Sequence, residues 1–472
     1  MKIGLKILIP FIITALMAGC ATYQPKPIAP DQAAAEFETR SLGDLGLKEF
    51  LHQNLKQEVI TWPLPSWDVA MLTLVAFYYH PDMDVARADL AVARAGVITA
   101  GGRPNPVAGF TPQYDVNSAG ISPWTLGFNL DIPIETAGKR GYRIAQANAL
   151  SDASRFKLAS VAWQVRSRVR KSLIELYAGR ERETMLTKQF DAQEHFTNML
   201  EQRFSRGMIA LPLITDARIA RDKTRLALDD AKRQTTEAIA ALADSLGLPG
   251  RALDDAHYSF DFIGTFPKDF PSDEMRRQAL LSRPDILSAL AEYAASESTL
   301  RLEIAKQYPD IQIGPGYTWD QGQNKWSIGF SLTLPLLNRN EGPIAEAEAR
   351  RQQAAARFTA LQARIIGELD KALAGYRASY QTLKTATDIL DAERVRRETL
   401  RKRLRPGETS SFTLTNADVS LITAELSRLD IHVKAQQALG LLEDALQRPL
   451  EQIENVFLEQ EANPRQGRGN LP

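Results

Sequence analysis

The sequence predicts an α+β membrane protein in which one long unit occurs twice. Three observations lead to this fold class. Matching residues recur about 200 positions apart in the sequence. Short segments alternate apolar and polar side chains, and long segments without proline have apolar residues at the helical period. Each unit is expected to contain a helix, two strands, a very long helix, a tight tip and a returning helix. The first repeat is predicted at 66–250 and the second at 273–450, with a linker at 251–272.

The duplication is visible in matched positions along the two halves. His80-Pro81-Asp82 corresponds to Arg283-Pro284-Asp285, and Gly207 corresponds to Gly407. The other matched positions are Pro106 and Pro309, Tyr114 and Tyr317, Pro133 and Pro335, Ile144 and Ile344, and Pro249 and Pro449. The offset stays between 200 and 203 residues, so a whole unit has been copied rather than a short motif.

The N-terminus predicts export and a lipid anchor. Residues 1–19 read as a signal peptide, because two lysines precede an apolar core that is too short to span a membrane in a stable protein. The stretch Leu16-Met17-Ala18-Gly19-Cys20 resembles a bacterial lipobox, which implies cleavage before Cys20 and acylation of its thiol. An ordinary signal peptide with an incidental cysteine is the alternative. Cys20 is the only cysteine, so no disulfide is expected.

Two polar segments flank the repeats. Residues 20–65 are predicted to form an extended lipidated arm that lies against the body, and residues 451–472 a C-terminal tail without a packed core. Ala21 lacks the aspartate that favours retention of lipoproteins at the inner membrane. The anchor is therefore expected in the inner leaflet of the outer membrane.

Four segments are predicted to be transmembrane strands, two in each repeat. One face of residues 124–132 carries Trp124, Leu126, Phe128, Leu130 and Ile132, opposite Thr125, Gly127, Asn129 and Asp131. Residues 326–334 and 311–319 alternate in the same way, with aromatic residues near the ends. A half-buried sheet of a soluble domain has this period too. The terminal Trp and Tyr residues and the small polar residues of the other face favour strands of a membrane barrel.

The ends of these strands are predicted from proline and glycine. Pro133 and Pro335 are expected to close their strands, since proline cannot donate a ladder hydrogen bond. The segments 116–123 and 320–325 are expected to be hairpin loops outside the cell.

The remaining length of each repeat predicts long antiparallel coiled-coil helices. No proline occurs from Gly141 to Arg206, so one helix there could extend about 100 Å at about 1.5 Å per residue. A heptad seam is predicted in the second repeat through Ile366, Leu369, Leu373, Tyr376, Tyr380, Leu383, Thr387 and Leu390. The returning segment repeats the pattern at Val419, Ile422, Leu426, Leu429 and Val433. A plain coiled coil would show the same seams.

Composition and motifs exclude several classes of protein. The 57 basic and 57 acidic side chains cancel, so no nucleic-acid partner is indicated. The sequence has no phosphate-binding glycine loop and no nucleophile elbow, and its five histidines lack the spacing of metal ligands. We therefore expect no enzyme, no metal site and no cofactor apart from the lipid on Cys20.

Closure of the sheet predicts the number of copies. Open sheet edges do not occur in lipid, so four strands cannot span a membrane alone. Two copies would give a barrel of about eight strands, whose interior is filled by side chains. Three copies would give about twelve strands and room for a water-filled lumen. A homotrimer is therefore the smallest open pore.

The order of strand, helix and tip over residues 65–449 resembles the TolC-type outer-membrane factors, the exit ducts of tripartite efflux and type I secretion systems. The resemblance implies three protomers that form a twelve-stranded barrel on an α-helical barrel, which crosses the periplasm of a Gram-negative bacterium. It implies as partners a periplasmic adaptor protein and an inner-membrane pump of the RND type. The stretch from Asp131 to Ala145, with Glu-Thr-Ala-Gly-Lys-Arg at its centre, is similar to the CzcC-like heavy-metal branch.

The resemblance assigns the two helix–turn–helix tips to the periplasmic entrance. The residues that it implies for adaptor contact are Gly207, Leu211, Gly407 and Ser411. Plain hairpin turns would account for the two glycines equally well. Many relatives place aspartates at the second tip, whereas this chain has Thr413 and Asn416 there. The candidate residues for a periplasmic constriction are Asp216, Glu408, Thr413, Asn416 and Asp418.

The predicted function is passive conduction through an outer-membrane duct, with energy supplied by the inner-membrane pump. The alternatives are a non-conducting coiled-coil lipoprotein that acts as a spacer, and the duct of a type I protein secretion system. Metal, drug and protein cargo remain open, since a duct need not recognise what passes through it.

Overall fold

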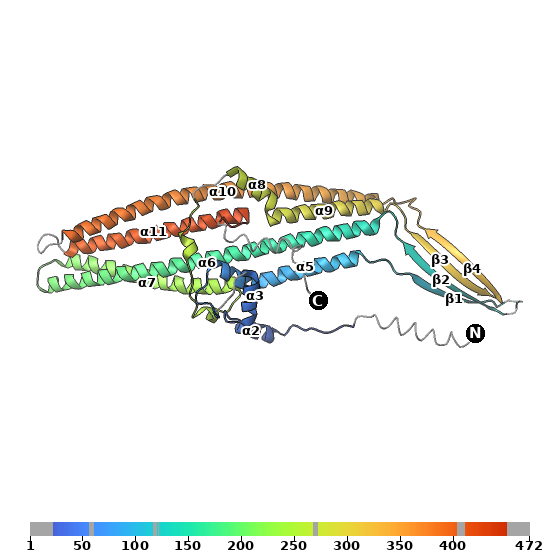
Figure 1. Ribbon diagram of the computed structural model, residues 1–472, viewed down its shortest axis with the longest axis horizontal. Helices are drawn as coiled ribbons and strands as arrows, with labels where there is room; N and C mark the ends of the chain where they lie inside the picture. Colours follow the sequence, from blue (N-terminus) through green and yellow to red (C-terminus); the bar gives the residue numbers. More distant parts are fainter. Residues whose placement is uncertain are drawn as a thin grey trace.

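The computed structural model describes residues 22–55, 61–116, 120, 122–267, 272–403 and 411–450. The chain forms one elongated body, with helices along most of its length and an antiparallel sheet at one end (Figure 1). Cys20 and the ranges 1–19 and 451–472 lie outside the described residues.

The elements follow the duplicated order that the sequence predicts. Two helices, α2 (Pro30–Thr39) and α3 (Leu45–Leu55), precede the first repeat, which begins with α4 (Val69–Tyr79). The first unit contains α5 (Pro81–Ala100), β1 (Val107–Tyr114), β2 (Trp124–Ile134), α6 (Lys139–Ser205) and α7 (Leu211–Leu246). The connecting elements are η1 (Gly250–Leu253) and η2 (Asp261–Gly264), and α8 (Ser272–Ser282) begins the second repeat. The second unit contains α9 (Pro284–Ala305), β3 (Ile311–Asp320), β4 (Gln323–Leu332), α10 (Glu341–Lys402) and α11 (Ser411–Leu446).

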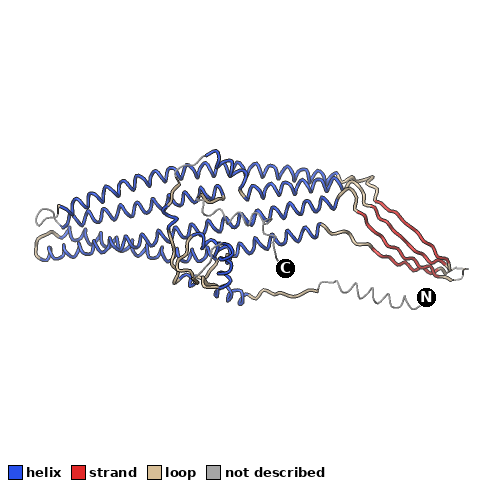
Figure 2. Tube along the Cα trace, viewed as in Figure 1, coloured by secondary structure: helices blue, strands red, loops and turns tan. Residues whose placement is uncertain are grey.

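The sheet continues directly into a layer of helices. Its strand order is β1-β2-β3-β4, and all three pairs are antiparallel. The helices attached to these strands follow the same order, because α6 packs against both α5 and α9, and α10 packs against α9 (Figure 2). The position of each strand in the sheet therefore fixes the position of its helix in the layer.

The ends of two strands differ from the prediction. The segment 320–325 is mostly strand rather than loop, because β3 and β4 are joined by Gln321 and Gly322 alone, at φ of 48° and 98°. Two positive φ values form a hairpin turn that matches the twist of the strands. β4 consequently begins at Gln323 and ends at Leu332, before the predicted end at 334.

Pro133 does not close its strand, which continues to Ile134. Pro133 pairs with Gln312 of β3, whereas the pairing of β2 with β1 already ends at Asp131. A proline is tolerated where the neighbouring strand on one side has ended.

The long helices confirm the predicted continuous segments. α6 contains 67 residues and is about 100 Å long at about 1.5 Å per residue. α7 and α11 each contain 36 residues and return from the tips. The heptad seam of α10 is largely buried as expected, but Ile365 rather than Ile366 is fully buried. Among the described helices, none has both the length and the apolar character needed to cross a membrane.

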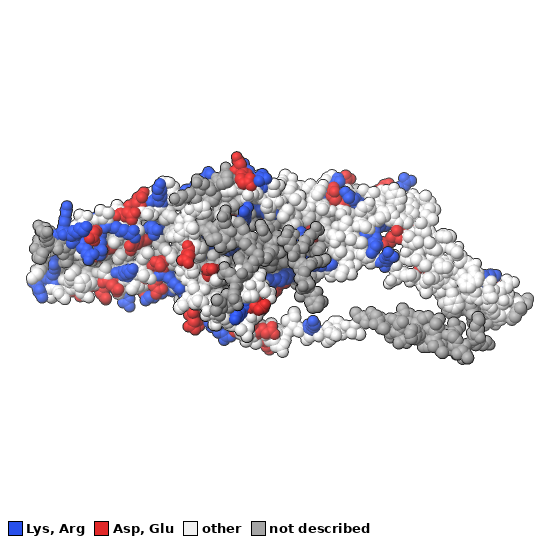
Figure 3. Space-filling model, viewed as in Figure 1, with Lys and Arg blue, Asp and Glu red and all other residues white. Residues whose placement is uncertain are grey.

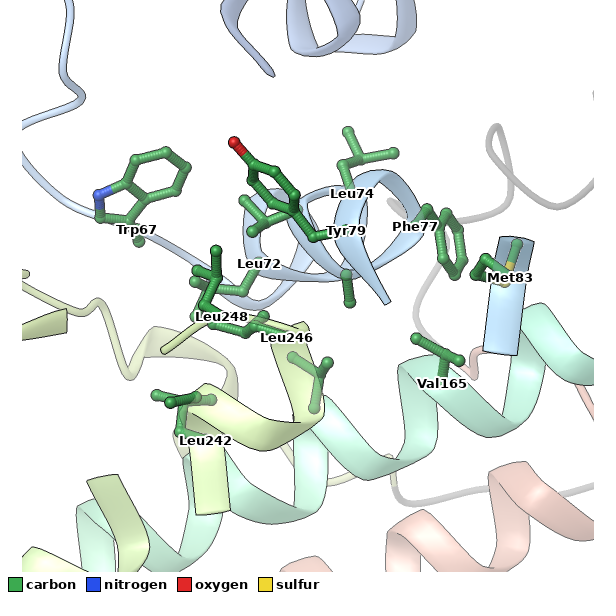
Figure 4. Close-up of a cluster of buried hydrophobic side chains, with 14 of the residues drawn as sticks. Trp67, Leu72, Leu74, Phe77, Tyr79, Met83, Val165, Leu242, Leu246 and Leu248 are labelled. Atoms are coloured by element: carbon green, nitrogen blue, oxygen red, sulfur yellow. The ribbon is translucent and has the colours of Figure 1, made fainter. Parts of the chain in front are cut away.

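The largest core cluster lies where the N-terminal helices meet the first repeat (Figure 4). α4 is apolar on most of its surface and is buried on nearly all sides. Leu72 of α4 lies in this cluster with Met83, Val165, Leu242 and Leu246. The arm is thus partly helical rather than extended, because Leu47 and Leu51 of α3 bury fully in the same cluster.

The segment between the repeats forms a belt across three long helices, which we define as residues 256–267. Rings of the belt contact Tyr177 of α6 and Tyr380 of α10. His432 and Gln436 of α11 both hydrogen-bond to the carbonyl oxygen of Ile263, at 3.0 and 2.6 Å. The belt therefore joins the two repeats halfway along the body.

Gly247 provides a test of the packing at the end of α7. Its φ is +71°, and a Cβ there would lie 2.6 Å from the carbonyl oxygen of Tyr79. We expect Gly247→Ala to lower the free energy of unfolding by about 2–3 kcal/mol, since backbone atoms would have to move. The control is Gly250→Ala, because nothing lies within 4 Å of that Cβ position. Thermal unfolding followed by circular dichroism in detergent measures both, and equal melting temperatures would contradict the expectation.

Candidate functional site

One face of the sheet is apolar across all four strands. Directly paired residues share a face, and the pairs include Phe110 with Phe128, Ile313 with Phe330, and Tyr317 with Trp326. The side chains are largely exposed in the single chain, and Trp326 is 82% exposed. An apolar face of this extent is a liability in water, whereas lipid would satisfy it.

Aromatic rings gather near the hairpin ends of this apolar face. Tyr114 and Trp124 pack with their ring centroids 5.1 Å apart, and Tyr317 and Trp326 pack at 4.9 Å. Tyr and Trp prefer the boundary between lipid and water, since each combines an apolar ring with a polar atom. Their position therefore indicates that the hairpin ends lie at a membrane surface.

The opposite face of the sheet is small and polar. It carries Gly109, Thr111, Gln113, Thr125, Gly127, Asn129, Asp131, Gln312, Gly314, Gly316, Thr318, Asp320, Gln323, Lys325, Ser327, Gly329 and Ser331. Asp320 accepts a hydrogen bond from Thr125 at 2.8 Å and pairs with Lys325 at 2.5 Å. Few charges appear over the sheet in Figure 3, whereas Lys, Arg, Asp and Glu are frequent over the helices. This face suits contact with water.

A cluster of polar contacts joins the two repeats where sheet and helices meet. Lys139 donates to the carbonyl oxygen of Tyr308 at 2.6 Å and to Asp310 Oδ1 at 2.7 Å. The backbone N–H of Thr136 also donates to Asp310 Oδ1, at 2.9 Å. Burial opposes ionisation of Asp310, but the bonds from Lys139 and Thr136 outweigh it and hold the pKa of this carboxyl below its usual value.

The other charged residues of the stretch 131–145 also have structural partners. Arg140 donates to the carbonyl oxygen of Gly101 at 2.7 Å, and Arg143 pairs with Glu135. Ala137 and Gly138 both have positive φ, which turns the chain sharply into α6. The stretch that resembles the heavy-metal branch therefore fixes the angle between strand and helix.

The first tip has the geometry expected of a tight turn. Gly207 has a φ of +72°, and its N–H donates to the carbonyl oxygen of Phe204 at 2.8 Å. Leu211 begins α7 and is 56% exposed. α7 has no side-chain cap, since Ala210 occupies the N-cap position. Asp216 is exposed one turn further along α7.

Only part of the second tip lies within the described residues. Gly407 and Glu408 lie outside them, and for Ser411 only the backbone, at the start of α11, is described. Thr413 and Asn416 are exposed. Asp418 is not a free carboxylate, because Arg397 of α10 pairs with it at 2.8 Å.

Each tip carries an ion pair between its two helices, and the two pairs have opposite polarity. In the first tip Arg218 of α7 pairs with Glu201 of α6 at 2.7 Å, and in the second Asp418 of α11 pairs with Arg397 of α10 at 2.8 Å. Arg218 and Asp418 are matched positions of the two repeats. Their partners on the long helices are not matched, because Glu201 corresponds to position 401 and Arg397 to position 197.

A buried ionic cluster, which sequence reasoning missed, joins α6 to α11. Glu443 lies 3.2 Å from Arg166 and 3.6 Å from Arg170, and all three side chains are more than nine-tenths buried. Trp163 Nε1 donates to Asp444 at 2.9 Å and Ser167 donates to it at 2.8 Å.

Burial raises the pKa of Asp444, although Ser167 and Trp163 donate hydrogen bonds to its oxygens. The partners in this cluster are about 270–280 residues apart in sequence, as for Arg166 and Glu443. No local pattern of residues could have indicated that they meet.

Two of the five histidines make contacts that stabilise the fold. His80 caps α5 by accepting from the backbone N–H of Asp82, and burial lowers the pKa of His432 beneath the belt. In the part of the chain that the structure describes, no three His, Cys, Asp or Glu side chains come together as ligands of a metal ion.

Comparisons with known proteins agree with this geometry. The family model described as "Outer membrane efflux protein" matches residues 77–248 and again residues 275–446. The chain is 24% identical over 360 residues to the cobalt-zinc-cadmium resistance protein CzcC of Cupriavidus metallidurans, which covers 76% of this chain and 80% of the relative. It is 23% identical to the probable outer membrane lipoprotein SilC of Salmonella typhimurium, over 34% of this chain and 37% of the relative.

A solved structure shares the fold. The outer membrane protein VceC of Vibrio cholerae superposes with a TM-score of 0.66 at 18% identity, over 81% of this chain and 97% of that protein. The α+β fold with a duplicated strand–helix unit, predicted from the sequence, is thus confirmed.

The Lys139–Asp310 pair can be tested by a double-mutant cycle. Asp310→Asn is expected to cost about 3 kcal/mol, since it leaves Lys139, whose side chain is only 9% exposed, without its counter-charge. Lys139→Met should cost about 1 kcal/mol, because the more exposed Asp310 keeps its bonds from Thr136. The double variant should cost less than the sum, and additive losses would contradict the coupling.

The pair also predicts a pH dependence. The pKa of Asp310 is lower in the folded state than its value of 3.8 in the unfolded chain. The carboxylate therefore stabilises the folded state above pH 3.8, and this stabilisation is lost as the pH falls through the folded pKa. Unfolding measured below pH 4 should therefore show a weaker pH dependence in Asp310→Asn than in the parent.

Proposed function

The chain belongs to the outer membrane efflux protein family, and from this membership we propose that it is the exit duct of a tripartite efflux complex. In this function three copies close a barrel across the outer membrane and a helical tube below it. The duct conducts passively, and an inner-membrane pump of the RND type and a periplasmic adaptor supply its cargo. No residue of the duct has to bind nucleotide or perform catalysis.

The observation that carries the proposal is the sheet with two contrasting faces. Its apolar face suits lipid, its small polar face suits a water-filled lumen, and both run across all four strands. Each strand leads directly into a long helix of a single layer, so a closed sheet would continue as a closed tube. A spacer that does not conduct would not need either face.

We assign divalent metal cations, such as cobalt, zinc and cadmium, as the cargo. The support is the match to CzcC over most of both chains. The junction stretch 131–145 does not add to this support, because its charged residues have structural partners. The metal passes as cargo, and the duct does not have to hold it.

The tips are assigned to the adaptor and to the constriction. Gly207, Leu211, Gly407 and Ser411 form the adaptor-contact group, and the exposed Leu211 and Met208 of the first tip offer it an apolar surface. The acid that remains available for a constriction among the described residues is Asp216, since Asp418 is paired. Cys20 carries the lipid anchor, in keeping with the lipoprotein named among the relatives.

Growth of a deletion strain tests the cargo. We expect the strain to become at least about tenfold more sensitive to cobalt, zinc or cadmium, with little change for dyes, detergents and antibiotics. The strain carrying the gene back on a plasmid is the control. Sensitivity to amphiphiles with unchanged metal tolerance would make the protein a multidrug duct and overturn the metal assignment.

Conductance in planar bilayers tests the constriction. We expect Asp216→Ala to raise the single-channel conductance or the open fraction, because it removes an exposed charge near the tip. Asp216→Glu, which keeps the charge, should behave as the parent. A conductance that is unchanged in Asp216→Ala would remove Asp216 from the constriction, and a protein that does not conduct at all would overturn the duct.

A further inference from the structure

A pocket of ≈ 660 Å³ lies where α2 meets the junction of α4 with α5 and the end of α7. The residues that line it include Phe37 of α2, Arg168 of α6 and Asp244 of α7. Its volume is in the range of pockets that enclose small organic molecules. The pocket belongs to neither the sheet nor the tips, so conduction does not require it.

His80 brings an unused hydrogen-bond donor to this pocket. Its side chain is only 8% exposed, and its Nδ1 accepts from the backbone N–H of Asp82 at 3.1 Å. Burial and the nearby Arg168 lower the pKa of His80, which keeps the ring neutral with its proton on Nε2. Nε2 has no hydrogen-bond partner among the described residues, and it is not sealed from solvent. A donor in this position needs an acceptor from outside the chain.

An acceptor and a cation lie close to this donor. Asp244 is exposed, and its carboxylate has no partner among the residues that the structure describes. Its charge acts on the ring of His80, so the two side chains are near each other. Arg168 pairs with Asp82 through Nη2, and its guanidinium has further N–H groups.

The second repeat satisfies the matched positions within the chain. Arg283 occupies the position of His80 and donates to the carbonyl oxygen of Ala445 at 2.6 Å. Asp444 occupies the position of Asp244 and accepts from two side chains of α6. The free donor and the free acceptor are therefore features of the first repeat and not a requirement of the fold.

We propose that this pocket binds a short peptide with free amino and carboxyl ends. The ammonium group of the peptide pairs with Asp244, and its carboxylate accepts from His80 Nε2 and from Arg168. An anion alone would meet the carboxylates of Glu38, Asp82 and Asp244. A cation alone would leave His80 without an acceptor. A ligand that carries both charges satisfies both groups.

The tautomer of His80 argues against a metal ion in this place. A metal ion binds an imidazole nitrogen that carries no proton, whereas Nδ1 is engaged by the backbone and Nε2 carries the proton. The rest of the lining includes Phe37, Ala243 and Leu248, which suit small apolar side chains of a peptide.

A bound peptide would also fix α2 to the body. α2 buries none of its own residues and is held through polar contacts. Arg40 donates to the carbonyl oxygens of Tyr79 at 2.8 Å and Gly247 at 2.9 Å. Phe37 and Glu38 of α2 line the pocket, so a peptide there adds contacts between α2 and α7.

Calorimetric titration of the purified full-length protein with alanyl-alanine tests the ligand class. We expect a Kd below about 1 mM. Binding should be at least about tenfold weaker for N-acetyl-alanyl-alanine, which lacks the ammonium group, and for alanyl-alanine amide, which lacks the carboxylate. No binding of alanyl-alanine at about 10 mM would overturn the proposal, as would equal affinity for the acetylated peptide.

Substitutions test the residues. Asp244→Asn and His80→Asn should each weaken binding at least about tenfold. Asparagine at position 80 can still cap α5, so only the Nε2 donor is lost. Asp229→Asn is the matched control, because Asp229 is an exposed aspartate of α7 that does not line the pocket, and it should bind as the parent does. Melting temperatures without peptide report whether each variant is folded, and full affinity in folded Asp244→Asn would overturn the proposal.

Zinc chloride and inorganic phosphate are the other two probes. Zinc binding that His80→Asn abolishes would make this a metal site, and phosphate that displaces the peptide equally in the parent and in Asp244→Asn would make it an anion site. Either result would overturn the peptide. The titrations do not depend on transport, so a protein that binds alanyl-alanine but does not conduct would overturn the duct and leave the pocket.

Discussion

A backbone N–H or C=O that faces lipid without a partner costs several kcal/mol, and much of this structure follows from avoiding that cost. The four strands pair with each other, but β1 and β4 each keep one edge that only another chain can pair. Because every strand continues into a helix of the same layer, pairing of these edges would also bring helices of neighbouring copies together. The order of the helices in their layer is thus set by the hydrogen bonding between strands in the sheet.

The duplication allows one chain to present two versions of the same kind of contact. Both tips have an ion pair between their two helices, although the charges exchange helices and the partner on the long helix moves by one turn. The buried cluster around Glu443, in contrast, exists in one version only, since the matched positions are Ala243, Ile366 and Asp370. In this way a duplicated protein can keep one kind of contact, such as the ion pair at the tip, in both helical hairpins. Another contact, such as the buried cluster between α6 and α11, can be present in one place only.

The elements that could be predicted from sequence are those with a local signal. Alternation identified β2, β3 and β4, the absence of proline identified α6, and the heptad seam identified α10. A hairpin loop was predicted at 320–325, but its reduction to Gln321 and Gly322 could not be predicted, because glutamine rarely adopts positive φ. At the site, the positions of both tips could be predicted from the sequence. The ion pairs of Asp418 with Arg397 and of Arg166 with Glu443 could not, because each joins two separate helices.

The belt at the middle of the body makes α11 a lever. Its two hydrogen bonds from α11 come from His432 and Gln436, and α11 extends from there to Ser411 at the tip. That arm of 25 residues is about 38 Å long, so a tilt of about 5° at the belt displaces the tip by about 3 Å. Such a displacement is comparable to the diameter of a water molecule. Angular changes too small to disturb the core would therefore be large where the helices end.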